Sequence, residues 1–288
     1  MPIFDLRNDI PKIRKELGKP FDGITSGIEC LDNKIIGFDK GEMITIAGRP
    51  GMGKSSLARD ILLNVSKPEN NYGVGVLCTM EMPCSQVIEL LATNLAKIDF
   101  SNMKKGDANE RTIDKFNIAI DKLSEYNIII NDDSYLIPES IRKLLLEISK
   151  VEPISCLIID YLQLMSLRTT MNNRQEEVAQ ISRELKAINM EFNVPVIAFS
   201  QLNRNVEYRE SCRPRMVDLR ESGAMENDSS MIILIHRQSY YDKQLDPNAE
   251  DTGEAEFIIC KHRTGNTGTV ECAFIGEWMS FCDRPKEF

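Results

Sequence analysis

The sequence predicts an α/β protein in which a largely parallel, twisted sheet carries helices on its faces and ends in an antiparallel hairpin. Three observations predict this class. Short runs rich in β-branched residues alternate with longer segments of helical period, which is the pattern of a parallel sheet with crossover helices. A glycine-rich loop lies between the first such run and a helix. A second glycine-rich connection, residues 263–268, joins the last two runs and suits a hairpin.

Individual elements follow from the spacing of apolar residues. Apolar residues recur at steps of three and four in the segment Arg174–Phe192, and again at Ile113, Phe116, Ile120 and Leu123, so each segment is predicted as a helix with one face toward the core. The predicted strands are Met43–Ala47, Val74–Thr79, Asn127–Ile130, Cys156–Asp160, Pro195–Ser200, Met231–His236, Phe257–Lys261 and Thr269–Phe274.

A short helix is predicted within residues 1–20, ahead of one large domain over residues 21–288. Ile10, Ile13 and Leu17 form an apolar edge on this helix, with a proline in its first turn and a glycine at its end. A helix this short is only marginally stable alone, so its apolar edge needs a partner. Its own domain and a neighbouring subunit both remain open as that partner.

Composition excludes several classes of protein. With 42% hydrophobic and 27% charged residues the chain is globular in type. Its apolar stretches are shorter than the roughly 20 residues that a membrane-spanning helix needs, and its charged first 20 residues do not read as a secretory signal. The 8 cysteines form no CxxC pair and the 2 histidines are not spaced as a ligand pair. We therefore expect a cytoplasmic protein with reduced, mostly buried thiols and without a zinc site.

The net charge of −9 argues against binding nucleic acid through bulk positive charge. Residues 204–220 are a local exception, called here the basic segment, because 5 arginines outnumber 3 acidic residues and leave a charge of +2. The basic segment follows directly on the predicted strand that ends at Ser200. A loop in that place can couple the state of a nucleotide to a nucleic-acid backbone. The alternative is an ordinary solvated loop.

A phosphate-binding loop carries the strongest chemical signal. Residues 48–55 read Gly-Arg-Pro-Gly-Met-Gly-Lys-Ser, which satisfies GxxxxGK[ST] between a strand and a helix. The loop amides can wrap a phosphate, Lys54 can reach the β and γ phosphates of ATP, and Ser55 can bind Mg²⁺. The predicted nucleotide contacts are Gly48, Arg49, Pro50, Gly51, Met52, Gly53, Lys54, Ser55 and Ser56.

Three polar residues at strand ends complete a predicted site for ATP hydrolysis. Asp160 ends one apolar strand, while Glu81 and Gln201 follow two others. The carboxyl ends of parallel strands meet at one edge of a sheet, so these side chains converge there. We assign Glu81 as the catalytic base, Asp160 as the Mg²⁺ carboxylate and Gln201 as the sensor of the γ-phosphate. A solvated surface acid is the alternative for Glu81.

Lys261 and Arg263 lie two positions apart on a predicted strand and therefore face the same side. Such a pair is either a solvated charged edge or an arginine finger that meets the charge of a transition state. The residues alone leave both interpretations open.

Together these residues resemble the C-terminal ATPase domain of DnaB-type hexameric replicative helicases, a RecA-like family of P-loop NTPases. The resemblance extends from about Phe21 to about Phe281. Its most specific runs are IIDYLQLM at 158–165, ISRELK at 181–186, SQLNR at 200–204, RPR at 213–215 and DLRESGA at 218–224. Departures from the family pattern include Thr79-Met80 before Glu81, Ser229-Ser230 after Asp228, and Thr264 where asparagine is usual.

The resemblance implies further roles. Lys261 and Arg263 become residues donated in trans to the ATP of a neighbouring subunit, and the helix within residues 1–20 becomes a linker helix that docks on that neighbour. The implied DNA contacts are Arg220, Glu221 and Gly223, and the basic segment adds Arg204 and Arg215 as candidate contacts. Family members also carry an N-terminal collar domain that engages primase. This sequence begins at the linker helix and includes no segment that corresponds to the collar domain. We therefore expect a naturally short form or a fragment.

The implied function is an ATP- and Mg²⁺-dependent helicase that forms a hexameric ring of identical chains, translocates on single-stranded DNA and unwinds duplex at replication forks. A helicase loader and primase are further candidate partners, and no membrane is involved. Two alternatives stay open. One is a RecA- or KaiC-like ATPase in recombination or signalling, and the other is an interaction protein that joins or inhibits the ring of another helicase.

Overall fold

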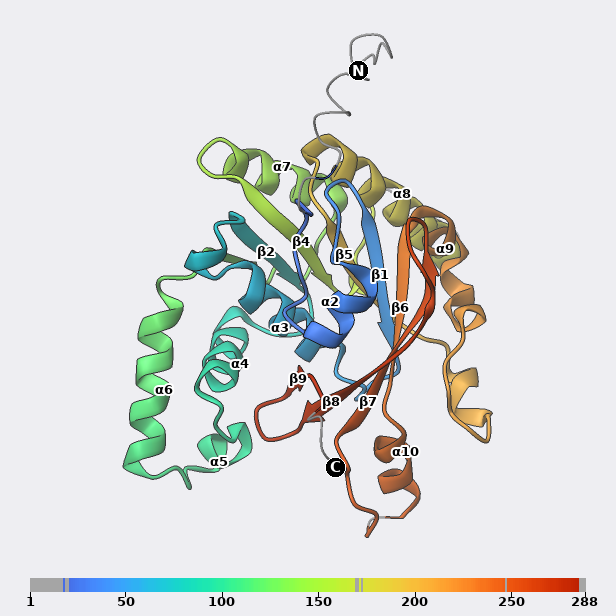
Figure 1. Ribbon diagram of the computed structural model, residues 1–288. Helices are drawn as coiled ribbons and strands as arrows, with labels where there is room; N and C mark the ends of the chain where they lie inside the picture. The colour runs from blue at the N-terminus through green and yellow to red at the C-terminus, as the bar shows by residue number, and fades with distance from the viewer. Residues whose placement is uncertain (1–17, 19–20, 169–170, 172, 247, 285–288) are drawn as a thin grey trace.

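The structure is a computed structural model that describes residues 18, 21–168, 171, 173–246 and 248–284. Its centre is one sheet with the strand order β3-β2-β4-β5-β1-β6-β7-β8-β9 (Figure 1). The strands from β3 to β6 in this order are parallel, and β7, β8 and β9 pair antiparallel. The predicted α/β class, with a largely parallel sheet and a C-terminal antiparallel hairpin, is confirmed. The predicted helix within residues 1–20 lies outside the described residues apart from Gly18.

All the predicted strands are present, with ends displaced by at most three residues. Their bounds are β1 Met43–Gly48, β2 Val74–Thr79, β3 Ile128–Asn131, β4 Ile154–Asp160, β5 Val196–Gln201, β6 Met231–His236, β7 Glu254–His262 and β8 Gly268–Ile275. The strand β9, Ser280–Cys282, was not predicted. Three residues are too few to display an alternating pattern, and β9 is extended because it pairs with β8.

Helices connect the strands and cover both faces of the sheet (Figure 1). The α-helices are α2 Glu29–Ile35, α3 Lys54–Val65, α4 Cys84–Ala96, α5 Phe100–Lys105, α6 Glu110–Leu123, α7 Pro138–Ser149, α8 Arg174–Phe192, α9 Gly223–Asp228 and α10 Gln238–Leu245. The short 3₁₀ helices are η1 Pro68–Asn70, η2 Leu162–Leu164, η3 Arg204–Tyr208 and η4 Met216–Ser222.

The two helices predicted from apolar period differ in their burial. The α8 stripe is buried as predicted, and it includes Val178, Ile181, Leu185 and Ile188. The α6 prediction is correct for the helix, and on its predicted face Phe116, Ile120 and Leu123 are half-buried, whereas Ile113 is 44% exposed. The physical reason is position, since α6 packs on α4 at the margin of the molecule rather than on the sheet.

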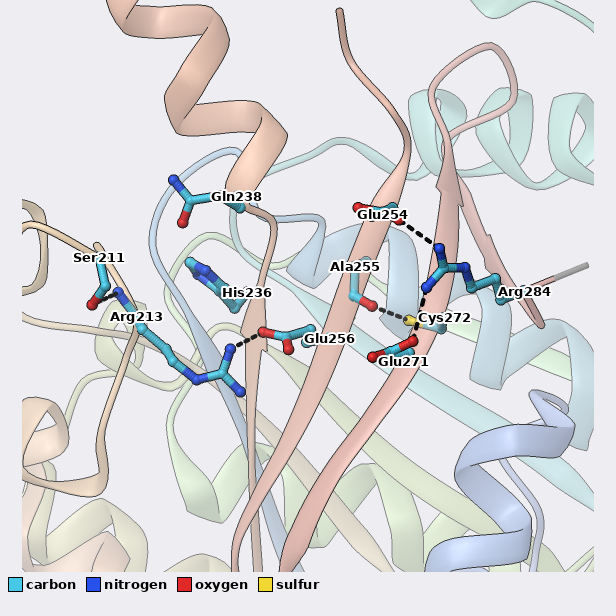
Figure 2. Close-up of a pocket in the computed structure, with 10 residues that line it drawn as sticks. All are labelled: Ser211, Arg213, His236, Gln238, Glu254, Ala255, Glu256, Glu271, Cys272 and Arg284. Carbon is cyan, nitrogen blue, oxygen red and sulfur yellow. Dashed lines mark hydrogen bonds and ion pairs between the residues drawn. The ribbon is translucent and has the colours of Figure 1, made fainter. Parts of the chain in front are cut away.

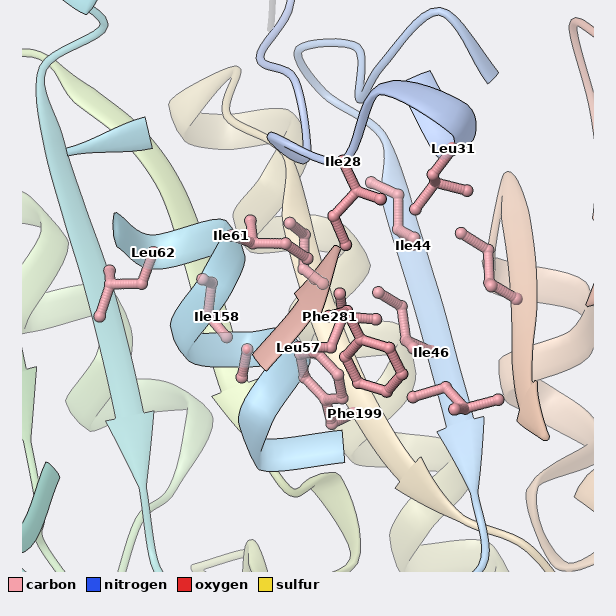
Figure 3. Close-up of a cluster of buried hydrophobic side chains, with 14 of the residues drawn as sticks. Ile28, Leu31, Ile44, Ile46, Leu57, Ile61, Leu62, Ile158, Phe199 and Phe281 are labelled. Carbon is pink, nitrogen blue, oxygen red and sulfur yellow. The ribbon is translucent and has the colours of Figure 1, made fainter. Parts of the chain in front are cut away.

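Each face of the sheet has its own apolar core. On one face α3 packs Leu57, Ile61 and Leu62 against strand residues such as Ile46 and Phe199 (Figure 3). Residues of α7 and α8 cover the opposite face. Full burial of one such side chain stabilises the fold by roughly 1.5–3 kcal/mol. Because the parallel strands are buried on both faces, they read in the sequence as continuous apolar runs, and their ends are held rigidly.

The 8 cysteines of the sequence are all free thiols. Cys78, Cys156 and Cys272 are buried and the other five are half-buried, so the expectation of mostly buried thiols was too strong. Burial raises the pKa of the Cys78 and Cys156 thiols to about 12.

Candidate active site

The phosphate-binding loop joins the end of β1 to the start of α3. Gly51 and Gly53 have φ angles of 80° and 96°, in the left-handed region that side chains disfavour. A Cβ atom on Gly53 would also lie 2.8 Å from the ring of Phe281. The helix α3 begins at Lys54, so its free N–H groups and its dipole point into the loop. The loop is therefore a cradle for an anion.

A cavity of about 370 Å³ opens over this cradle. Its lining residues are Pro50, Gly51, Gly53, Lys54, Ser55, Ser56, Glu81, Tyr161, Gln201, Arg237, Phe274, Gly276 and Met279. The loop residues that do not line the cavity are Gly48, Arg49 and Met52. Gly48 is the last residue of β1 and Met52 is buried. The structure thus brings the loop, Glu81 and Gln201 together, although they come from three separate strand ends.

Asp160 lies at the base of the cradle and is only 2% exposed. Burial raises the pKa of its carboxyl group, while a hydrogen bond with the Ser55 side chain and the charge of Lys54 oppose that shift. The Oδ1 atom of Asp160 is buried and has no hydrogen-bond partner within the described part of the chain. An unsatisfied carboxylate oxygen beside a serine hydroxyl is the donor set that Mg²⁺ prefers. Asp160 and Ser55 therefore fit the predicted metal site.

Lys54 is enclosed by groups of both charges. Its Nζ atom donates to the carbonyl oxygen of Arg49 at 3.2 Å. Burial lowers the pKa of Lys54, and the carboxylates of Asp160 and Glu81 act in the opposite direction. Glu81 is exposed and lies two residues beyond Thr79, which pairs with Asp160 in the sheet. Glu81 therefore lines the cavity together with Lys54, and the buried Asp160 acts on the same ammonium group from beneath it.

The end of β5 is fixed by a glutamine to which the sequence assigned no role. The Oε1 atom of Gln163 accepts from the backbone N–H of Gln201 at 3.1 Å. Its Nε2 atom donates to Ser200 Oγ at 2.7 Å and to the Gln201 carbonyl oxygen at 3.2 Å. Gln201 also pairs with Gly48 at the start of the phosphate loop. The predicted sensor is therefore tied to the cradle through its backbone.

The far wall of the cavity comes from the C-terminal strands, and sequence reasoning missed it. Arg237 is 4% exposed, donates to the Gly51 carbonyl oxygen at 3.4 Å and pairs with Asp251 at 3.0 Å. Its guanidinium lies 4.0 Å from the centre of the Phe274 ring. Arg237 directly follows β6, so the rule that identified Glu81 and Gln201 also finds this arginine. Phe274 and Met279 carry no comparable signal.

The Arg49 side chain turns away from the cradle. It is buried and donates through Nη1 to the Leu202 carbonyl oxygen at 2.7 Å and through Nε to Glu207 Oε1 at 2.8 Å. Arg49 therefore contributes to the cradle through its backbone, while its side chain reaches the start of the basic segment.

Comparisons with known proteins identify the family of this chain. The family model described as the DnaB-like helicase C terminal domain matches residues 23–283. The chain belongs to this family. Replicative DNA helicase DnaC of Bacillus subtilis (strain 168) is 36% identical over 267 residues, and replicative DNA helicase DnaB of Geobacillus stearothermophilus is 35% identical over 267 residues. In both cases the match covers 92% of this chain and 58% of the relative, so the chain spans little more than half of their length.

Solved structures give the same family. One of them, described as an ATPase domain, has a TM-score of 0.89 and 31% identity, covering 99% of this chain and 100% of the other. A DnaB-like replicative helicase, described with its interactions with primase, has a TM-score of 0.87 and 33% identity, covering 97% of this chain and 68% of the other. The resemblance to the DnaB-type ATPase domain, predicted from the residues, is confirmed.

In this DnaB-like domain, Lys261 and Arg263 lie at the edge of the sheet opposite the cradle. Because β7 is antiparallel to β6, its end meets the beginning of β6, where the backbone N–H of Arg263 donates to Ser230 at 2.9 Å. The Lys261 Nζ atom donates a hydrogen bond to the carbonyl oxygen of Glu226 at 2.6 Å. The strand stops at His262, so Arg263 lies just beyond it. Neither residue lines the cavity of its own chain.

The basic segment is folded rather than loose. It contains η3 and most of η4, and Arg209 forms two hydrogen bonds with the buried carboxylate of Asp218, one of them 2.7 Å long. Asp218 also accepts from the backbone N–H of Arg215 at 2.7 Å. Arg204 and Arg215 are exposed. The remaining predicted DNA contacts are Arg220 and Glu221 in η4 and Gly223 at the start of α9.

A second cavity, of about 300 Å³, separates the basic segment from β7 and β8 (Figure 2). Arg213 crosses its margin to pair with Glu256 and to donate to Thr269 at 3.3 Å. Arg284 pairs with Glu254 and Glu271 on the other side. Most of its charged groups are thus already paired, and none of them belongs to the phosphate loop. The Arg213–Glu256 pair at its margin joins the basic segment to β7.

Across the described residues there is no helix both long and apolar enough to span a membrane.

Proposed function

We propose that this chain is the ATP-hydrolysing motor of a ring-forming DNA helicase that translocates on single-stranded DNA and unwinds duplex at replication forks. One observation carries the proposal: the groups that would hold and hydrolyse ATP lie at one edge of the sheet, while the finger candidates lie at the opposite edge of the same chain. A chain built in this way completes its site only with a second copy.

The chain's own residues hold the nucleotide. Amides of the phosphate loop and the start of α3 receive the phosphates, and the ammonium group of Lys54 neutralises their charge. Ser55 and Asp160 would hold Mg²⁺, which supplies further neutralisation of charge on the phosphates. Arg237 and Phe274 form a further wall of the cavity, and Arg237 also donates to the Gly51 carbonyl oxygen of the loop.

Hydrolysis then needs a base and a positioned amide. The Glu81 carboxylate takes a proton from the attacking water, and its exposed position in the cavity suits that task. The Gln201 amide donates a hydrogen bond to the γ-phosphate, and Gln163 keeps that strand end in register. Each of these roles uses a group that the fold already directs into one space.

The neighbouring subunit supplies the missing cations. The five steps from Met43 to Gly48 span about 17 Å of β1, which separates Arg263 from the cradle of its own chain. Burial and the adjacent Arg263 lower the pKa of Lys261, so two cations lie close together where an anionic phosphate would relieve their repulsion. We therefore assign Lys261 and Arg263 to the ATP of the next subunit in a ring, proposed to be a hexamer.

Single-stranded DNA is the proposed track. The exposed Arg204 and Arg215 offer charge to its phosphates, and the family's DNA-contacting loop corresponds to Arg220, Glu221 and Gly223, at the end of the basic segment and just beyond it. A helicase loader and primase are proposed as further partners, primase because one similar structure is described with its interactions with primase. Membership of the DnaB-like family disfavours the recombinase or signalling alternative.

A forked DNA duplex tests the proposal. The wild-type protein with ATP and Mg²⁺ is expected to displace the annealed strand, and Lys54→Ala is expected to displace none. Full ATPase activity from a monomer that ignores single-stranded DNA would contradict the proposal. Failure to unwind, combined with inhibition of another helicase, would instead support the interaction protein.

A further inference from the structure

The bonds of Arg49 join the nucleotide cradle to the basic segment. Arg49 belongs to the phosphate loop, yet its guanidinium bonds to Leu202 and to Glu207. A second nitrogen, Nη2, lies 2.7 Å from the same Glu207 oxygen. The Arg49 side chain is 7% exposed and that of Glu207 is 43% exposed. A buried guanidinium with one carboxylate partner depends strongly on that partner, because losing it leaves an uncompensated charge.

Glu207 links Arg49 to the two 3₁₀ helices of the basic segment. It lies in η3, whose last turn is followed by Arg209, and Arg209 clamps Asp218 in η4. Backbone bonds continue the connection, because Asn203 donates to the Asp218 carbonyl oxygen at 3.1 Å. These bonds hold the two 3₁₀ helices together as one folded unit, which Arg49 joins to the cradle. The proposed DNA contacts in η4 belong to that unit.

The other end of the connection lies beside the phosphates. Lys54 donates to the carbonyl oxygen of Arg49, the residue at which the connection begins. In the proposed function Lys54 reaches toward the β and γ phosphates, so binding and release of ATP act directly on the backbone of Arg49. A shift of the Arg49 backbone would be transmitted to Glu207 and Leu202, because the Arg49 side chain is buried and hydrogen-bonded to both.

We propose that the Arg49–Glu207 pair couples nucleotide occupancy to DNA affinity, with Glu207 as a positioning residue that acts through the basic segment. The proposal rests on the proposed function and adds the residues through which its two sites communicate. Coupling of this kind is reciprocal and is measured as the ratio of DNA dissociation constants without and with nucleotide.

The test measures that ratio with fluorescent oligo(dT), with and without a non-hydrolysable ATP analogue. We expect a wild-type ratio in the range of about 5 to 150. Glu207→Gln is expected to bring it within about twofold of one, with ATPase in the absence of DNA close to wild type. Glu207→Asp, which keeps the charge, is expected to recover part of the coupling. Glu210→Gln, an exposed acid on the same segment, serves as the matched control and keeps the wild-type ratio.

A second variant separates the bond from the charge. Arg49→Lys keeps a cation but lacks the forked guanidinium that reaches both Leu202 and Glu207, so the ratio is expected to fall. In the double variant Arg49→Lys/Glu207→Gln the ratio is expected to be no lower than in Arg49→Lys, because both changes break the same contact. If Glu207→Gln keeps the wild-type ratio and its thermal unfolding is unchanged, the coupling proposal is overturned and the proposed function stands. A wild-type protein that does not bind oligo(dT) overturns the proposed function with it.

Discussion

The two edges of this sheet hold complementary halves of the proposed catalytic site. At the carboxyl edge the cradle, Asp160 and Glu81 meet within one chain. At the amino edge Lys261 and Arg263 are brought to the start of β6 by an antiparallel strand, about 17 Å from that cradle. The first edge is complete in a monomer apart from its ligands. In the proposed function the second edge acts on another copy, so the reversal of direction at β7 is the reason to expect that activity requires a ring.

The strongest way to break this comparison is to remove the candidate finger. Arg263→Ala is expected to lower kcat by roughly 10³-fold or more, since an arginine finger contributes on the order of 10³–10⁵ in rate. Mixed with Glu81→Gln protein it should regain activity, because some interfaces then combine an intact base with an intact finger. Steady-state ATPase of verified mixed rings measures this. Persistent inactivity of such rings would move Arg263 out of the trans role.

At the carboxyl edge the corresponding change is Glu81→Gln. It is expected to reduce hydrolysis by roughly 10²–10⁴-fold, because the amide cannot accept the proton of water. The nucleotide dissociation constant should stay within a few-fold of wild type, since the cradle is intact. Single-turnover hydrolysis and nucleotide titration measure the two effects, with the exposed Glu69→Gln in η1 as control. Wild-type turnover in the Glu81 variant would reassign the base.

The DNA side of the comparison is tested by salt. Arg215→Ala is expected to weaken binding to single-stranded DNA and to reduce the slope of log K against log salt by about 0.7, the loss of one phosphate contact. Arg209→Ala is not a suitable substitute, because it also releases the buried Asp218. Titration of labelled oligonucleotide at several salt concentrations gives the slope. An unchanged slope would remove Arg215 from the DNA path.

The smallest expected effect concerns the wall of the cavity. Asp60 on α3 accepts hydrogen bonds from Ser280 and from the Phe281 backbone, both at 2.8 Å, and so holds β9 and its turn against the loop helix. Burial raises the pKa of Asp60 from 3.8 to about 6. The folded state therefore binds this proton more tightly than the unfolded state, and the contribution of Asp60 to stability falls as the pH rises from about 4 to about 6.

Denaturant unfolding of wild type and Asp60→Asn across that range measures the effect as a difference, which cancels the other titrating groups. We expect the wild-type stability, relative to the variant, to decrease across this pH window by an amount on the order of 1 kcal/mol or more, as one pKa unit corresponds to about 1.4 kcal/mol. A difference that does not vary with pH would show that Asp60 does not titrate there.

Much of the nucleotide site was predictable because its signals are local. The phosphate loop is one contiguous run, and Asp160, Glu81 and Gln201 each stand at the end of an apolar strand that can be recognised by itself. Arg237 obeys the same rule and was overlooked. Phe274 and Met279 were not predictable, because they reach the cavity only through the pairing of β8 with β9, a strand of three residues.

The amino-acid sequence by itself determined the class of fold, the strand ends that carry polar groups and the family, because apolar period and short motifs are properties of neighbouring residues. Only the tertiary structure decided which residues share a space. It turned the Arg49 side chain from the phosphates toward Glu207, and it carried Arg263 away from the cradle of its own chain. Both outcomes depend on strand direction and on burial, which arise from contacts between residues far apart in the chain.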